Sequence, residues 1–119
     1  EAAQSRSKTG QYEKANEYLE RAVLLSSDPM LYYVMAKNEQ CLGEYRQAEK
    51  HLLHAIDILP ERIYPYYLLM NLYTEPSYFQ PAKLKMAIDS VLTKKPKVES
   101  SAIKEMKEKA RSMLNNTSI

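Results

Sequence analysis

The chain has 119 residues, which is the size of one domain, and its 45% of hydrophobic residues is too high for a disordered protein. The single cysteine, Cys41, excludes an internal disulfide, and a net charge of +2 is too small to indicate nucleic-acid binding by itself. Only 2 glycines occur, whereas Met, Leu, Ala, Lys and Glu are abundant. Because these are good helix formers, we expect an all-α protein.

Two helices are expected before residue 28. A remnant of a helix over residues 1–8 ends in a turn at Thr9-Gly10, and a second helix runs over 12–25 with apolar residues at the spacing of one helix face. The residues expected on that inner face are Ala15, Tyr18, Leu19, Ala22 and Val23. We therefore expect residues 1–28 to form a partial helix–turn–helix unit.

A complete unit is expected over residues 29–62. Asp28 can cap a helix over 29–41, and Pro29 fits the first position of that helix. Gly43 makes the turn, because only glycine adopts a left-handed conformation at no steric cost. A second helix over 45–59 is ended by Pro60. The inner faces are expected to carry Tyr32, Met35, Ala36, Leu42, Tyr45, Ala48, Leu52, Ala55 and Ile56.

A divergent third unit is expected over residues 63–97, with a helix beginning near Ile63 and another over 81–93. The turn between them carries two prolines and two aromatic residues where the second unit has a glycine. The inner face of the first of these helices is expected to carry Tyr66, Leu69, Met70 and Tyr73.

Residues 98–114 are expected to form an amphipathic helix that closes the array, and residues 115–119 are expected to fray. The apolar stripe of the closing helix carries Ile103, Met106, Ala110, Met113 and Leu114.

One spacing of residues occurs three times along the chain. It reads Gly10-x-Tyr12-x-x-Ala15-x-x-x-Leu19-x-x-Ala22, then Gly43-x-Tyr45-x-x-Ala48-x-x-x-Leu52-x-x-Ala55, then, degraded, Phe79-x-x-Ala82-x-x-x-Met86. The second copy stands 33 residues after the first, and the third stands 34 after the second. We expect the alanines at points where two helices cross closely, and the aromatic residues in the wedge beside each turn.

With this period and this set of residues, the chain resembles the tetratricopeptide repeat family over nearly its whole length. The resemblance implies an α–α superhelix of about three helix–turn–helix repeats plus the C-terminal capping helix. It also implies a non-catalytic module that binds a protein or peptide in a concave groove. The third repeat departs from the pattern at its turn and at Asp89, and an unrelated helical bundle is the alternative.

The groove of the family is lined by the first helix of each repeat. Mapped onto this chain, the groove positions are Met30, Tyr33, Lys37, Gln40 and Cys41 in the second repeat and Tyr64, Tyr67, Asn71 and Thr74 in the third. Tyrosine rings supply contact area, and amides can bond a peptide backbone. The alternative is that these residues are solvated. The carboxylate clamp that grips chaperone tails is not reproduced, because Tyr33 stands at its position.

A narrower resemblance lies in residues 72–79 and 91–106, which are similar to the tail of bacterial, Bacteroides-type O-antigen ligase or polymerase membrane proteins. It implies a fragment, the soluble tail of an inner-membrane protein, on either side of the membrane, with a regulatory or assembly role. A free-standing cytoplasmic adaptor is the alternative. Self-association and contact with carbohydrate or lipid are further hypotheses. No membrane catalytic residue of that family lies in this chain.

No catalytic residue, cofactor or metal site is expected. His51 and His54 stand three apart without an evident third ligand, Cys41 has no activating pattern, and no glycine-rich loop occurs. Residues 94–119 carry 7 basic and 3 acidic side chains. No aromatic residue interleaves with them, so nucleic acid is not expected. A solvated helix face is favoured over a weak attraction to anionic lipid.

Overall fold

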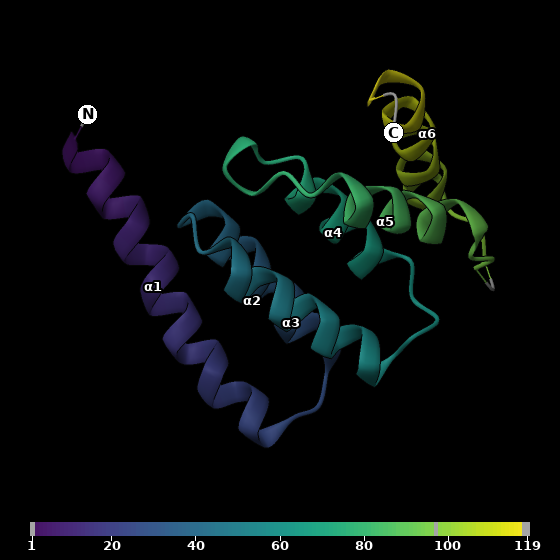
Figure 1. Cartoon of the computed structure of the whole chain (residues 1–119). Helices are drawn as coiled ribbons and strands as arrows, with labels where there is room; N and C mark the ends of the chain where they lie inside the picture. The colour runs from purple at the N-terminus through teal and green to yellow at the C-terminus, as the bar shows by residue number, and fades with distance from the viewer. Residues whose placement is uncertain (1, 97, 118–119) are drawn as a thin grey trace. The chain divides into compact units, whose positions relative to one another are not determined.

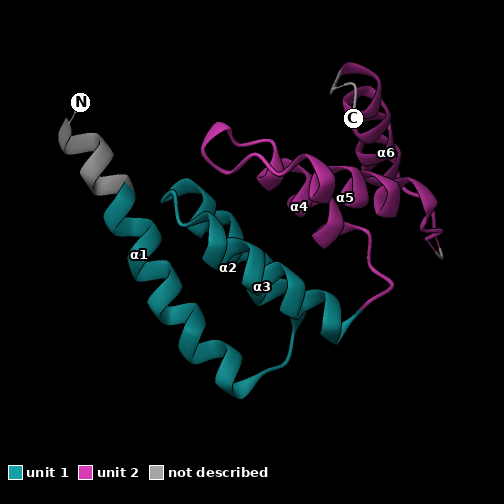
Figure 2. Cartoon of the chain, viewed as in Figure 1, with its two compact units in different colours: residues 1–59 teal, residues 60–119 magenta. Residues whose placement is uncertain are grey.

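The chain is all-α throughout the residues that the structure describes. A computed structural model describes the backbone of residues 2–96 and 98–117 and the side chains of 9–96 and 98–116. Its elements are α1 (Ala2–Leu25), α2 (Pro29–Cys41), α3 (Tyr45–Ile58), α4 (Tyr64–Tyr73), the short 3-10 helix η1 (Pro76–Tyr78), α5 (Pro81–Thr93) and α6 (Ser101–Thr117) (Figure 1). They group into unit 1, residues 1–59, and unit 2, residues 60–119 (Figure 2).

In unit 1, α2 packs against both α1 and α3. The start of α2 is fixed by Asp28, whose carboxylate accepts a hydrogen bond of 3.0 Å from the Met30 N–H. Pro29 takes the first helical position, where a missing N–H costs nothing. The predicted cap and the predicted bounds of this helix, residues 29–41, are confirmed.

The connection from α2 to α3 is a left-handed turn at Gly43, which has a φ of 78°. The N–H of Gly43 donates to the carbonyl of Gln40 at 3.1 Å, and the N–H of Glu44 donates to the carbonyl of Glu39 at 2.8 Å. This pair of bonds is a Schellman motif, which satisfies the last carbonyls of the helix. The predicted turn at Gly43 is therefore confirmed.

The turn predicted at Thr9-Gly10 is wrong, because α1 runs without interruption from Ala2 to Leu25. A glycine inside a helix costs only about 1 kcal/mol relative to alanine. Extending an existing helix is easier than nucleating a short separate one. Residues 2–8 and 12–25 therefore belong to one helix, and the described part of unit 1 begins with a long helix in place of a partial hairpin.

The alanines of the repeated spacing have different surroundings in different helices. In α3, Ala48 and Ala55 are 1% and 0% exposed, as expected for a close crossing of helices. Ala15 in α1 and Ala82 in α5 are exposed, so the prediction is wrong for these two positions. Tyr18, predicted to face inward, is 73% exposed. The same residue pattern therefore marks a buried face only where a second helix lies against it.

Unit 2 is a hairpin of α4 and α5, with α6 packed against both helices. The predicted bounds of the helix over 81–93 are confirmed. The residues of its core are almost fully buried: Leu68, Leu69, Met70, Leu72, Tyr73, Leu84, Ala87, Ile88, Val91 and Ala110.

The last helix of the chain is joined to the end of α5 by a lysine. The Lys107 ammonium donates to the carbonyls of Val91, Leu92 and Lys94 at 3.1, 3.2 and 2.8 Å. A cation at this position complements the negative end of the α5 dipole. Fraying was predicted from residue 115, but the helix continues to Thr117; residues 118–119 lie outside the described part of the chain.

The third copy of the spacing does not mark the buried face of α5. Phe79 and Met86 are 53% and 69% exposed. The buried residues Leu84, Ile88 and Val91 stand 36 positions after Ala48, Leu52 and Ala55, not 34. The longer connection over residues 74–80, which contains η1, moves the register of the second helix by two residues. The wedge predicted for Phe79 is therefore wrong.

The two glycines give a matched test of this fold. No atom lies within 4 Å of a Cβ added at either position, so only backbone conformation decides the outcome. We expect Gly10→Ala to raise the free energy of unfolding by up to about 1 kcal/mol, and Gly43→Ala to lower it by about 1–2 kcal/mol. Urea unfolding followed by circular dichroism measures both. A loss of stability in Gly10→Ala would contradict the continuous α1.

The register of α5 gives a second test. Replacing the buried Ile88 with alanine should destabilise the protein by about 2–5 kcal/mol, because it leaves a cavity. Met86→Ala, at an exposed position, should change stability by no more than about 0.5 kcal/mol. The midpoints of thermal unfolding of the two variants compare them. A larger loss of stability in Met86→Ala than in Ile88→Ala would indicate that this helix keeps the 34-residue register.

Candidate binding faces of the helices

The predicted binding residues of α2 differ in exposure. Met30 is 56% exposed, Lys37 is exposed, and Gln40 is half-buried. Tyr33 is only 5% exposed, so its ring belongs to the packed side of the helix. The exposed line of α2 consists of Met30, Val34, Lys37 and Cys41, which recur at i, i+4, i+7 and i+11. Val34 was missed, although helical spacing from Met30 would have found it.

The predicted binding residues of α4 lie together on one side of the helix. Tyr64, Tyr67, Asn71 and Thr74 recur at i, i+3, i+7 and i+10, and all four are half-buried. We call this set the α4 face. The rings of Tyr64 and Tyr67 stack with centroids 6.4 Å apart and an angle of 24° between their planes. A stacked pair on a helix face presents a flat apolar surface that is partly open to solvent.

A polar group on the α4 face is buried without a hydrogen bond. The Oδ1 atom of Asn71 has no donor among the described residues. The neighbouring Thr74 hydroxyl donates instead to the main-chain carbonyl of Asn71, at 2.7 Å. An unsatisfied buried acceptor costs about 1–3 kcal/mol, so such groups are rare without a reason. The Asn71 side chain therefore has one acceptor that is enclosed and unpaired among the described residues.

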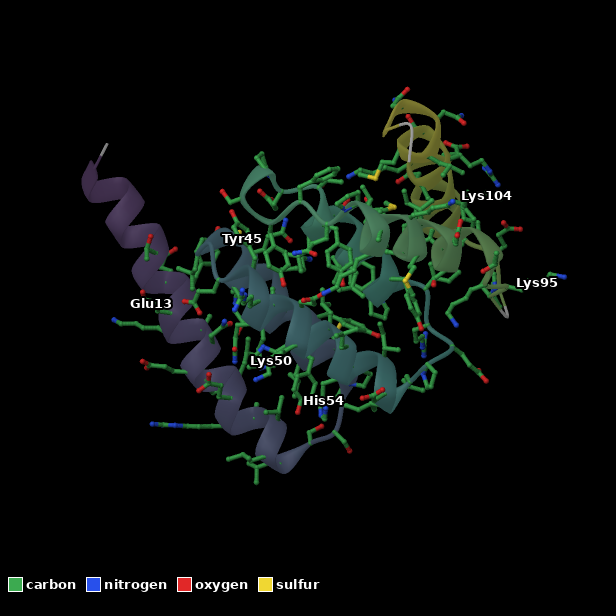
Figure 3. All side chains as sticks on the ribbon, viewed as in Figure 1. Glu13, Tyr45, Lys50, His54, Lys95 and Lys104 are labelled. Atoms are coloured by element: carbon green, nitrogen blue, oxygen red, sulfur yellow. The ribbon has the colours of Figure 1, made fainter. Side chains whose placement is uncertain are left out.

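Two lysine ammonium groups lie over tyrosine rings of α4. The Nζ atom of Lys109 in α6 lies 5.5 Å from the centroid of the Tyr67 ring, and that of Lys94 lies 4.9 Å from the centroid of Tyr66. Sequence analysis found no aromatic residue among these basic residues, because the rings are nearly 30 positions or more away along the chain. Lys109 is exposed, as expected for a solvated lysine face, and Lys104 and Lys95 are exposed as well (Figure 3), whereas Lys94 is half-buried.

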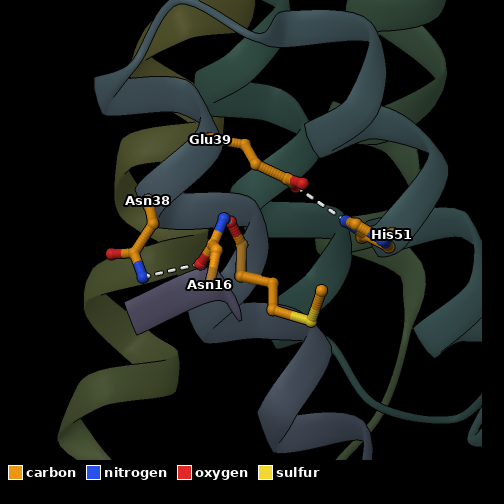
Figure 4. Close-up of polar contacts among 5 residues, drawn as sticks. Asn16, Asn38, Glu39 and His51 are labelled. Atoms are coloured by element: carbon orange, nitrogen blue, oxygen red, sulfur yellow. Dashed lines mark hydrogen bonds and ion pairs between the residues drawn. The ribbon is translucent and has the colours of Figure 1, made fainter. Parts of the chain in front are cut away.

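A polar cluster joins the helices of unit 1 (Figure 4). The Glu39 carboxylate, with 4% of its side chain exposed, lies 2.7 Å from His51 Nδ1 across the α2–α3 contact. The Asn38 amide donates to Asn16 Oδ1 at 2.9 Å, and Asn16 donates to the carbonyl of Met35 at 3.3 Å. These bonds satisfy polar groups that would otherwise be costly to bury.

The sequence shows no evident further ligand beside the two histidines of α3. In the structure, His51 is half-buried and paired with Glu39. The pair was missed because its members stand 12 positions apart on different helices. His54 is exposed, and its ring lies edge-on to Tyr32 with centroids 4.7 Å apart. The cluster therefore orders the α2–α3 contact.

The Cys41 thiol, which lies in hydrogen-bonding reach of the Tyr12 hydroxyl, raises the pKa of that tyrosine.

Within the described residues, no group of three or more His, Cys, Asp or Glu side chains is placed to hold a metal ion. None of the described helices combines the length and the apolar character needed to cross a membrane.

No protein-family model matches the chain, and no curated protein matches it either.

The Glu39–His51 pair gives a test of the α2–α3 contact. His51→Ala should lower the free energy of unfolding by about 1–3 kcal/mol, because it leaves a buried carboxylate without its partner. In the His51→Ala/Glu39→Gln double variant the two losses should not add, since both remove one interaction. Chemical denaturation of the four proteins measures this coupling. The exposed His54→Ala is the control, and additive losses would contradict the pairing.

Proposed function

We propose that this chain is a non-catalytic protein-interaction module of the tetratricopeptide repeat type, which binds a peptide or protein segment on the α4 face of unit 2. The observation that carries the proposal is the α4 face itself. It combines a stacked tyrosine pair with the half-buried polar residues Asn71 and Thr74. Rings offer contact area at low entropic cost, and amide and hydroxyl groups can bond a peptide backbone.

The repeat type is supported by the first helices of the two hairpins. Met35, Ala36 and Glu39 of α2 are buried. The residues 34 positions later, Leu69, Met70 and Tyr73 of α4, are buried as well. These helices therefore keep the period of the family, although the second helix of unit 2 is displaced from it.

The chemistry of the ligand follows from the charges beside the tyrosines. Lys109 lies over the ring of Tyr67, so a segment bound on the α4 face meets a cation beside this ring. A peptide with one or two carboxylates complements this arrangement. In a membrane-bound polysaccharide ligase of the kind that the narrower resemblance implies, the module would serve as a regulatory or assembly part.

The α4 face can be tested without losing the fold. We expect Asn71→Leu to keep or raise the midpoint of thermal unfolding, because it removes an unsatisfied buried acceptor. Combined with Tyr67→Ala, it should abolish capture of a specific partner by the immobilised domain from a lysate of the source organism, read by mass spectrometry. Phe79→Ala, which removes an exposed ring elsewhere in unit 2, is the matched control. A partner that both variants retain would sink the proposal.

A further inference from the structure

One face of α1 is largely exposed to solvent, whereas the corresponding face of α3 is covered by another helix. Ala15, Tyr18, Ala22 and Leu25 recur at i, i+3, i+7 and i+10, so they lie on one side of the helix; we call them the open face of α1. Tyr18 is 73% exposed, Leu25 is 92% exposed, and Ala15 is exposed. The packed side of α1, which carries the buried Asn16, contacts α2 instead.

The corresponding residues of α3 stand 33 positions later and are covered. They are Ala48, His51, Ala55 and Ile58. Ala48 and Ala55 are 1% and 0% exposed, and only 17% of the His51 side chain is exposed. The helix seated on this side of α3 is α2. The ring of Tyr32 lies 5.8 Å from that of His51 and 4.7 Å from that of His54, and Glu39 is bonded to His51.

We propose that the open face of α1 is a docking site for one amphipathic helix that runs antiparallel to α1, as α2 runs antiparallel to α3. Alanines at positions 15 and 22 leave room for a helix backbone to approach closely, as they do at 48 and 55. Tyr18 and Leu25 supply the apolar area that such a contact would bury. The site lies in unit 1 and does not depend on the α4 face.

The residues around the open face define the chemistry of the docked helix. His51 and His54 of α3 are replaced in α1 by Tyr18 and Arg21. A ring at the place of Tyr32 would stack on Tyr18 and lie against the Arg21 guanidinium. A carboxylate two turns later, at the place of Glu39, would accept a hydrogen bond from the Tyr18 hydroxyl. Lys14 and Arg21 border the face, so an acidic edge on the docked helix is favoured.

The α2 segment itself is the available probe for this chemistry. A fluorescein-labelled peptide of residues 28–42 carries both the ring of Tyr32 and the carboxylate of Glu39. We expect the whole chain to bind this peptide in fluorescence anisotropy. A peptide with Tyr32→Ala and Glu39→Gln should bind at least about tenfold more weakly, because both specifying groups are gone.

Protein variants locate the binding to α1. Ala15→Glu should weaken binding of the peptide at least about tenfold, since it places a charge in the centre of the contact. Ala82→Glu makes the same change at another exposed helical alanine and should leave binding unchanged. Circular dichroism should show both variants folded, because both positions are exposed. The Tyr67→Ala/Asn71→Leu variant should also bind the peptide normally, so that failure of the α4 face and failure of this site are distinct.

Three outcomes would overturn the inference. The first is no binding of the peptide by the unaltered chain. The second is equal binding by Ala15→Glu, which would place the peptide elsewhere, for example by exchange with α2 itself. The third is a dimer of the chain in sedimentation that Ala15→Glu dissolves, because a second copy would then be the natural occupant of the open face.

Discussion

The left-handed turn at Gly43 is the constraint on which unit 1 depends. With a φ of 78° and two bonds to the end of α2, it returns the chain so that α3 lies against α2. That return buries Ala48 and Ala55 and brings the Glu39 carboxylate to His51. Gly10 opens the same sequence motif but lies within a helix. No hairpin forms there, and one face of α1 therefore has no helix against it.

In unit 2, the two helices of the hairpin are joined by a longer connection. The connection between α4 and α5 contains η1, and the rings of Tyr73 and Tyr78 stack across it at 6.5 Å. The buried face of α5 is therefore shifted by two residues relative to the repeated spacing. Leu84, Ile88 and Val91 face the core, while Met86 faces solvent. The Lys107 ammonium then joins α6 to the last carbonyls of α5. Packing thus tolerates a register shift when the connecting loop absorbs it.

The two proposed surfaces differ in their physical character. The α4 face has stacked rings, polar side chains and a neighbouring cation, which suit a polar peptide backbone with acidic side chains. The open face of α1 has small and apolar residues, which suit the close approach of a preformed helix. Both are helix faces that would bind by complementarity, and neither needs a covalent step.

Local signals in the sequence determined the element type and several of the boundaries. Asp28, Pro29 and Gly43 fixed the ends of α2, because caps, prolines and glycine turns act within a few residues. Tertiary structure decided the continuity of α1 at Gly10, the pairing of Glu39 with His51, and the seating of Lys109 over Tyr67. These depend on whether a second helix lies against the first and in which register. Residue spacing alone does not encode that, since Ala48 is buried in α3 whereas Ala15, at the same place in the pattern, is exposed in α1.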